Sequence, residues 1–118
     1  MRAVSLAGVV NLQRAFDLHL SNDAVVEFLG GKPAEVAEHY QEADPMQVSI
    51  SKARQVLIWG SKDDVVPPDF NRKYAEVKQA KGENVKLVEI ANADHYDVID
   101  PRSEAWKRVE GAVTELLG

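Results

Sequence analysis

The chain has 118 residues, of which 45% are hydrophobic and 28% charged, and its net charge at pH 7 is −5. This length predicts a single domain over residues 1–118 that buries roughly two-thirds of its unfolded surface. The mildly acidic balance argues against a nucleic-acid partner, which would require clustered Lys and Arg. The longest apolar stretch is far too short for a membrane span.

The sequence contains no cysteine, which rules out disulfides, zinc–thiolate sites and cysteine nucleophiles. This composition is compatible with a reducing compartment, so we expect a cytoplasmic location. The first residues, MRAVSLAGVVNLQR, combine an Arg with an apolar run as signal peptides do, but no small-residue cleavage site follows. A buried strand is the better interpretation, although a signal in chain preceding Met1 would change the compartment.

The first part of the chain predicts a strand. Residues 3–10, AVSLAGVV, are apolar apart from Ser5 and rich in β-branched side chains, which is typical of a strand covered on both faces of a parallel sheet. Gly8 weakens the far end of this run, so we expect the strand to stop near Ala7. Mixed helical spacing of apolar residues follows from residue 12 to residue 29.

Short helices and a connector come next. The segment SNDAVVEFLGG predicts a helix with Ser21 or Asn22 as its N-cap and two glycines as its stop. PAEVAEHYQEA predicts a second short helix that starts at Pro33. Residues 44–53, DPMQVSISKA, are expected to form an extended connector.

The second half of the chain alternates strand and helix. QVLIWG (55–60) is the clearest strand, and NVKLVEIA (84–91) alternates as a strand near a sheet edge does. The segment 67–83 predicts a helix that Gly82 ends, and residues 103–117 predict another helix. The apolar face of the first of these helices comprises Phe70, Tyr74, Val77 and Ala80.

This order of elements predicts an α/β fold. Strand, helices, strand, helix, strand and helix in succession imply right-handed crossovers and a three-stranded parallel half-sheet flanked by helices. A sheet of three strands has two open edges unless something covers them.

Polar residues follow two of the predicted strands. GSKDDVVP (60–67) comes after one strand and carries Asp63 and Asp64, and NADHYDVIDP (92–101) comes after the next and carries His95. The carboxyl ends of neighbouring parallel strands lie about 4.8 Å apart, so these loops can touch. An aspartate that accepts a hydrogen bond from a histidine ring fixes the histidine tautomer. An acid–base pair at this end of the sheet is therefore a candidate site.

Structural roles explain the same residues without catalysis. SKDD followed by PP suits an acidic turn and a helix start, and His95 alone suits a surface histidine bonded to a carbonyl. His19 and His39 lie in polar helical surroundings, where a structural role is expected. Asp97 and Asp100 do not make a metal site with His95, because a second well-placed histidine is lacking.

A family resemblance favours a catalytic role for the acid–base pair. VLIWGSKDDVVP followed by NADHYDVIDP resembles the C-terminal half of the α/β-hydrolase fold, and within it the small esterases and lipases of the carboxylesterase or hormone-sensitive-lipase-like kind. The resemblance implies that Asp63 is the acid and His95 the base of a Ser-His-Asp triad. It implies that Asp64 caps or turns the loop and is the fallback acid. It implies neither a cofactor nor a metal.

The rest of the chain fits the same resemblance. RAVSLAGVVNL resembles the strand that follows the nucleophile strand and helix, and FLGGKPAEVAEHYQEADP resembles the lid-side segment after it. The family's nucleophile stands in a Gly-x-Ser-x-Gly turn. No such turn surrounds any of the six serines, which are Ser5, Ser21, Ser49, Ser51, Ser61 and Ser103. An oxyanion loop of the His-Gly-Gly type is absent as well, so the chain is expected to be inactive or nearly so alone.

Three interpretations of the missing nucleophile remain open. The chain is the C-terminal portion of an esterase, or it is completed by a separate N-terminal half, or it is a non-enzymatic binding or assembly module derived from a hydrolase. The first strand, residues 3–10, would then have an apolar edge without the Lys or Pro that guards such edges. We therefore expect a homodimer in which two first strands pair across a two-fold axis into one continuous sheet.

Overall fold

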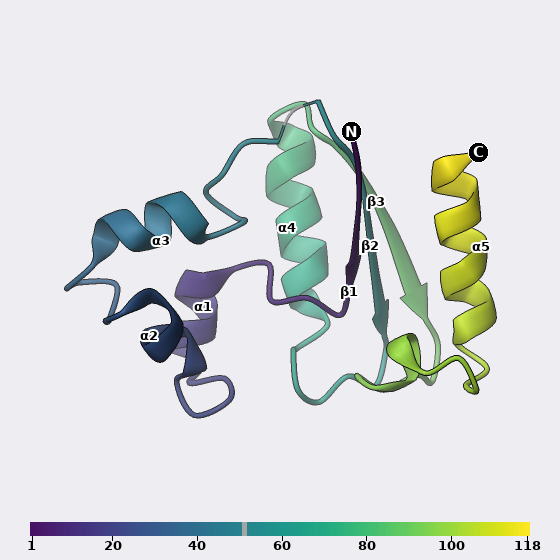
Figure 1. Cartoon of the computed structure of the whole chain (residues 1–118), viewed down its shortest axis with the longest axis horizontal. Helices are drawn as coiled ribbons and strands as arrows, with labels where there is room; N and C mark the ends of the chain where they lie inside the picture. The colour runs from purple at the N-terminus through teal and green to yellow at the C-terminus, as the bar shows by residue number, and fades with distance from the viewer. Residues whose placement is uncertain (51) are drawn as a thin grey trace. The chain divides into compact units, whose positions relative to one another are not determined.

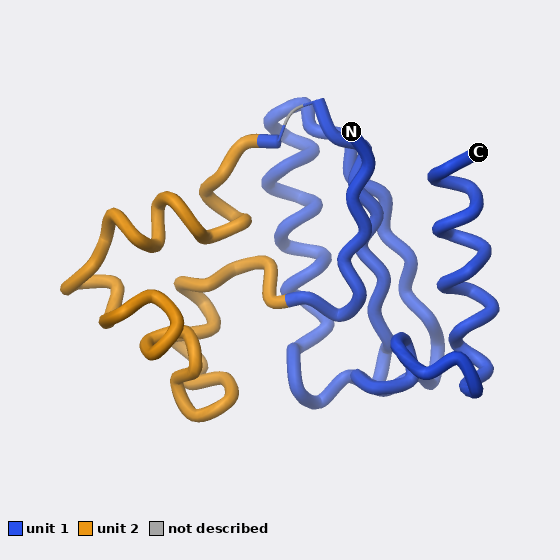
Figure 2. The backbone as a smooth tube through the Cα atoms, viewed as in Figure 1, with its two compact units in different colours: residues 1–8, 50–118 blue, residues 9–49 orange. Residues whose placement is uncertain are grey.

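The computed structural model describes residues 1–50 and 52–118. Ser51, one of the serines considered as a nucleophile, lies outside the described residues. The chain forms two compact units: residues 1–8 with 50–118 make the first, and residues 9–49 make the second (Figure 2). The expectation of a single domain, drawn from length, stays a prediction.

The first unit is a parallel sheet with helices. Its three strands lie in the order β1-β2-β3, and neighbouring strands are parallel. The strands are β1 (Arg2–Leu6), β2 (Arg54–Gly60) and β3 (Asn84–Ile90), and the helices are α4 (Asp69–Ala80), the 3-10 helix η1 (Asp97–Ile99) and α5 (Trp106–Leu117). The predicted α/β class and the predicted order of elements are confirmed.

Helices cover both faces of this sheet, with α4 on one side and α5 on the other (Figure 1). Side chains alternate along each strand, so β2 serves both layers. On one face Val56 and Ile58 belong to a core that includes Val109 of α5. On the opposite face Gln55 accepts a hydrogen bond from the Tyr74 hydroxyl of α4 at 2.5 Å. Burial on both faces explains the unbroken apolar run of β2.

The strand β1 stops close to Ala7, as expected, but it is more exposed than its sequence predicts. It ends at Leu6, because Ala7 adopts a left-handed backbone conformation with φ 51°. Residues 8–10 are therefore outside the strand. Its first three residues are exposed, so the prediction that both faces of this strand are covered is wrong for these residues. Among the strands that the structure describes, β1 lies at the edge of the sheet.

The second unit consists of α1 (Leu12–Asp17), α2 (Ala24–Leu29) and α3 (Ala37–Ala43). Val25, Leu29 and Tyr40 form its buried core. The buried Asp44 carboxylate accepts the amides of the first residues of α1 at 2.8 and 3.2 Å. This bond satisfies donors that a helix start leaves without intrahelical partners.

Local backbone geometry corrects three predictions in this unit. The N-cap of α2 is Asp23 rather than Ser21 or Asn22, because the helix begins at Ala24. Asp23 has a left-handed backbone with φ 60°, and its side chain makes no capping hydrogen bond. The helix α3 begins at Ala37 rather than at Pro33. The connector after α3 contains hydrogen-bonded turns at Asp44 and is not fully extended.

None of the helices in the described part of the chain is both long and apolar enough to cross a bilayer.

Candidate active site

The loop after β2 is organised by one buried carboxylate. Oδ1 of Asp63 accepts the backbone amides of Val65 at 2.9 Å and Val66 at 2.8 Å, which closes the turn. The Asp63 side chain is 1% exposed. Asp64 was expected to cap this loop, but it is exposed and Asp63 performs the capping itself. The turn therefore holds Asp63 in one orientation and leaves Oδ2 for another partner.

Backbone hydrogen bonds join this loop to the loop after β3. The amide of Ser61 donates to the Ile90 carbonyl at 2.9 Å, and the amide of Lys62 donates to the Ala93 carbonyl at 2.9 Å. In return, the Asn92 amide donates to Oγ of Ser61 at 2.9 Å. These bonds extend the ladder between the strands, so the two loops have a common geometry.

Gly60 permits the close approach of the two loops. A Cβ atom added at this position would lie 2.1 Å from the carbonyl oxygen of Ala93, far inside van der Waals contact. The glycine of the motif GSKDDVVP is thus required by the backbone of the neighbouring loop. Its role is steric, because its φ is not in the left-handed region.

The second loop presents His95 to Asp63. Oδ1 of Asp94 accepts the amides of Tyr96 and Asp97, each at 2.9 Å, which forms a tight turn around the histidine. Nδ1 of His95 lies 2.8 Å from Oδ2 of Asp63. The Tyr96 ring stands edge-on to the imidazole, with ring centroids 5.1 Å apart. Two self-capped loops thus set the distance between the acid and the imidazole.

The hydrogen-bond pattern defines which ring nitrogen is available. An ionised carboxylate only accepts, so Nδ1 of His95 carries the proton in the bond to Asp63. In the neutral ring Nε2 then has a free lone pair that can accept a proton from a hydroxyl. The His95 side chain is 23% exposed, whereas that of Asp63 is 1% exposed. The pair therefore has a buried acid and an accessible base.

The other candidate residues have partners of their own. His19 makes a similar contact, with Nδ1 2.8 Å from Asp23 Oδ1, but both side chains are on the surface. Nδ1 of His39 bonds the Leu29 carbonyl at 2.6 Å. Asp100 pairs with Arg102, and this hydrogen bond lowers the pKa of the Asp100 carboxyl. Each of these groups has a structural partner.

No described serine hydroxyl is hydrogen-bonded to His95. Oγ of Ser61 accepts the Asn92 amide, and Oγ of Ser103 donates to the Asp97 carbonyl at 2.6 Å. Within the residues that the structure describes, no group of three or more histidines and carboxylates is arranged to hold a metal.

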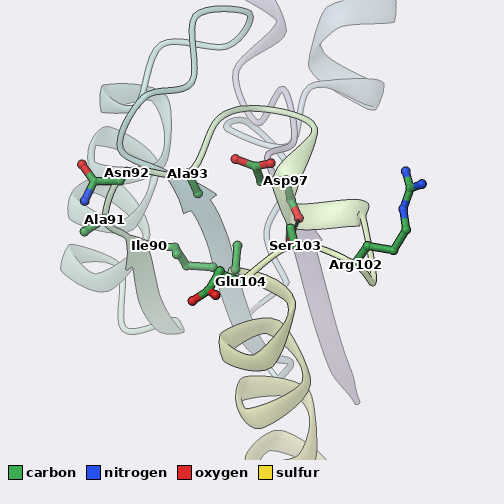
Figure 3. A pocket seen from close by; sticks show the side chains of 9 residues that line it. Ile90, Ala91, Asn92, Ala93, Asp97, Arg102, Ser103 and Glu104 are labelled. Atoms are coloured by element: carbon green, nitrogen blue, oxygen red, sulfur yellow. Dashed lines mark hydrogen bonds between the residues drawn. The ribbon is translucent and has the colours of Figure 1, made fainter.

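A cavity of about 650 Å³ lies beside the β3 loop (Figure 3). Its lining residues are Ile90, Ala91, Asn92, Ala93, Asp97, Arg102, Ser103, Glu104 and Ala105. Figure 3 shows the Arg102 side chain extending away from the others. Neither Asp63 nor His95 is among the residues that line this cavity. The sequence contained no signal for it, because its walls come from a loop and a helix start that only folding brings together.

Comparison with known proteins identifies the fold. No family model and no curated protein matches the sequence. An esterase from Thermogutta terrifontis is 21% identical, with a TM-score of 0.72 over 98% of this chain and 41% of its own. A truncated carbohydrate esterase from gut microbiota is 19% identical, with a TM-score of 0.71 over 98% and 42%. An acylaminoacyl peptidase from Pyrococcus horikoshii is 20% identical, with a TM-score of 0.64 over 83% and 16%.

The Thermogutta esterase has also been solved phosphoramylated by tabun and with propionate or butyrate bound. This chain spans about two-fifths of the length of the two esterases that it matches. The likeness covers nearly the whole of this chain and runs through the sheet that carries Asp63 and His95. Over the part that it matches, the chain has the α/β-hydrolase fold.

Proposed function

We propose that this chain carries the acid and the base of a serine-hydrolase charge relay that acts on carboxylic esters. Asp63 orients His95 through Nδ1, and Nε2 of His95 accepts the proton of a serine hydroxyl. The observation that carries the proposal is the 2.8 Å contact between a fully buried carboxylate and a partly exposed imidazole. The two amides on the other oxygen of Asp63 keep the acid from rotating away.

In this proposal each residue has one task in acyl transfer. His95 removes the serine proton as the serine oxygen attacks the ester carbonyl, and it then returns that proton to the leaving alcohol. Asp63 stays ionised and stabilises the imidazolium that forms between these steps. Water repeats the sequence to release the carboxylic acid. Neither step requires a cofactor.

The serine and the oxyanion donors belong, in this proposal, to polypeptide outside these 118 residues. The sequence has no Gly-x-Ser-x-Gly turn, and loss of a triad nucleophile removes several orders of magnitude of rate. We propose short-chain acyl esters as the substrate class, because the similar Thermogutta esterase binds propionate and butyrate. A cytoplasmic location remains part of the same proposal.

Esterolysis of an activated ester tests the role of the pair. With p-nitrophenyl acetate, we expect the purified chain to release nitrophenolate slowly above the buffer rate, with His95→Ala removing most of the excess. His19→Ala is the matched control, because His19 has an aspartate at the same 2.8 Å but on the open surface. Equal rates for the parent chain and His95→Ala would show that the His95 imidazole does not act as a base on water in the isolated chain.

A fluorophosphonate probe tests the location of the nucleophile. Intact mass after labelling is expected to show no adduct on the isolated chain. A stoichiometric adduct on one serine, abolished by His95→Ala, would show that the nucleophile lies within these residues and would overturn that part of the proposal.

A further inference from the structure

The stretch that carries His95 lies between two residues of the core. Ala93 is 4% exposed and Val98 is 0% exposed, and both belong to the core that the sheet shares with α5. None of the four side chains between them, residues 94–97, is buried. Burial of apolar surface stabilises only the groups that it covers, so packing cannot fix this stretch. Its hydrogen bonds must do so.

Two carboxylates of this stretch cap each other's backbone amides. Oδ1 of Asp94 accepts the amide of Asp97 at 2.9 Å, and Oδ2 of Asp97 accepts the amide of Asp94 at 2.9 Å. Oδ1 of Asp94 also accepts the amide of Tyr96 at 2.9 Å. Asp94 and Asp97 thus form a closed aspartate ring. Its bonds hold the backbone on both sides of His95, where no regular element supplies them.

Asp97 ties the aspartate ring to the rest of the first unit. Its carbonyl accepts the Ser103 hydroxyl at 2.6 Å and the Asp100 amide at 3.2 Å. Its amide and its carboxylate bond to Asp94, and the residue that follows it is the buried Val98. Asp94, in contrast, is exposed. The core therefore fixes the aspartate ring through Asp97.

We infer that Asp97 is a positioning residue for His95: through the aspartate ring it holds the imidazole in contact with Asp63, at 2.8 Å. The inference rests on the proposed function, in which Nδ1 of His95 donates to Asp63 while Nε2 accepts the serine proton. The ring requires from Asp97 an oxygen that accepts a hydrogen bond, and not its negative charge. The bonds that form the ring join residues 94–97 only, so they do not depend on polypeptide outside this chain.

The distribution of the His95 proton between Nδ1 and Nε2 tests this role. Nitrogen-15 NMR of the neutral imidazole measures it, and the parent chain is expected to carry the proton on Nδ1. Asp97→Ala opens the aspartate ring. We expect the ratio of the Nδ1–H to the Nε2–H form to fall roughly two- to tenfold, as the loss of one typical hydrogen bond allows. Asp97→Asn keeps an acceptor oxygen and is expected to retain the parent ratio.

Two controls separate this effect from a general loss of structure. Asp100→Ala removes a carboxylate of the same loop that bonds Arg102 and not the aspartate ring, so it should leave the ratio unchanged. The Trp59 indole, which donates to Oε1 of Glu89 at 3.2 Å, reports in the same NMR sample whether the sheet is folded. If Asp97→Ala fails to fold, Asp94→Ala opens the ring from its other side and should give the same fall.

The variants and the parent chain answer different questions. An unchanged ratio in a folded Asp97→Ala or Asp94→Ala would overturn the positioning role. Equal falls in Asp97→Ala and Asp97→Asn, or in Asp97→Ala and Asp100→Ala, would overturn it as well. A parent chain that carries the His95 proton on Nε2 would instead contradict the proposed relay of Asp63 and His95, and the positioning role with it.

Discussion

The sheet of the first unit carries one buried carboxylate at each end. Asp63 lies at the carboxyl end and Glu83 at the amino end, and each side chain is 1% exposed. The partners differ. The His95 side chain beside Asp63 is 23% exposed, whereas the Lys78 side chain, whose Nζ lies 3.6 Å from Glu83, is 1% exposed.

The amino-end cluster is closed on itself. Oε1 of Glu83 accepts Nε2 of Gln55 at 3.1 Å and the Ile50 amide at 3.3 Å, while Gln55 in turn accepts the Tyr74 hydroxyl. The other oxygen of Glu83, Oε2, is buried without a hydrogen-bond partner and lies 3.6 Å from Nζ of Lys78. At the carboxyl end the chain of bonds finishes on an imidazole that reaches the surface. Burial of a carboxylate alone therefore does not distinguish the two ends of the sheet; the exposure of its partner does.

The largest expected effect comes from filling the space at Gly60. Gly60→Ala places a methyl 2.1 Å from the Ala93 carbonyl oxygen, so the two loops must separate or the sheet must distort. We expect a loss of more than about 4 kcal/mol in the free energy of unfolding, measured by urea denaturation. Gly111→Ala is the control, because a Cβ there meets nothing within 4 Å and a helical alanine should stabilise by about 0.5–1 kcal/mol.

Breaking the closed cluster should cost less. Glu83→Ala removes the ion-pair partner of the buried Lys78 and the acceptor of Gln55, with an expected loss of about 3 kcal/mol. Glu115→Ala removes the ion pair between Lys86 and Glu115, which are both exposed, and should cost under about 1 kcal/mol. Thermal unfolding of the two variants measures the difference; equal losses would contradict the contrast between buried and exposed carboxylates.

The cluster around Glu83 predicts that the folded chain loses stability at alkaline pH. Burial and the Glu83 carboxylate raise the pKa of the Tyr74 phenol above its ordinary value of 10.0. Above pH 10 the unfolded chain then loses a proton that the folded chain keeps, so stability falls as pH rises. Tyr74→Phe should cost about 1 kcal/mol at neutral pH and reduce the alkaline slope of the unfolding free energy. Tyr40, whose pKa burial also raises, should account for the slope that remains.

The pair of Asp63 and His95 should show a small effect on stability and a clear effect on the imidazole. Asp63→Asn keeps an oxygen to accept the amides of Val65 and Val66, so we expect a loss of only about 1 kcal/mol. The asparagine amide can donate to Nδ1 of His95, which would move the ring proton to Nε2. Nitrogen-15 NMR of the histidines should report this change of tautomer. An unchanged His95 tautomer in Asp63→Asn would contradict the orienting role of Asp63.

Much of the fold and of the candidate site can be predicted from the sequence. The apolar run of β2, the alternation of β3 and the helical spacing between them identified a parallel α/β sheet, because these patterns reflect burial by neighbouring layers. The positions of Asp63 and His95 after successive strands placed them at one end of the sheet. Their separation of 2.8 Å depends on hydrogen bonds between the two loops, which no local pattern encodes.

The predictions that were wrong also depend on contacts between segments far apart in the sequence. Lys78 and Asn71 are buried on α4, although the apolar face was assigned to other positions, and Ala80 of that predicted face is exposed. A lysine is read as a surface residue unless its partner is known, and Glu83 becomes that partner only when the chain turns back at Gly82. Asp64 was expected to cap the β2 loop beside Asp63. Instead Asp63 both caps the loop and contacts His95, because its side chain is the buried one.

The sequence alone determined the class of fold, the order of its elements and the two loops that carry polar chemistry, since these follow from periodicity and turn-forming residues. Tertiary structure decided which aspartate meets His95 and why residue 60 must be glycine. Each of these depends on the register between strands far apart in sequence, and register is set by packing across the whole sheet.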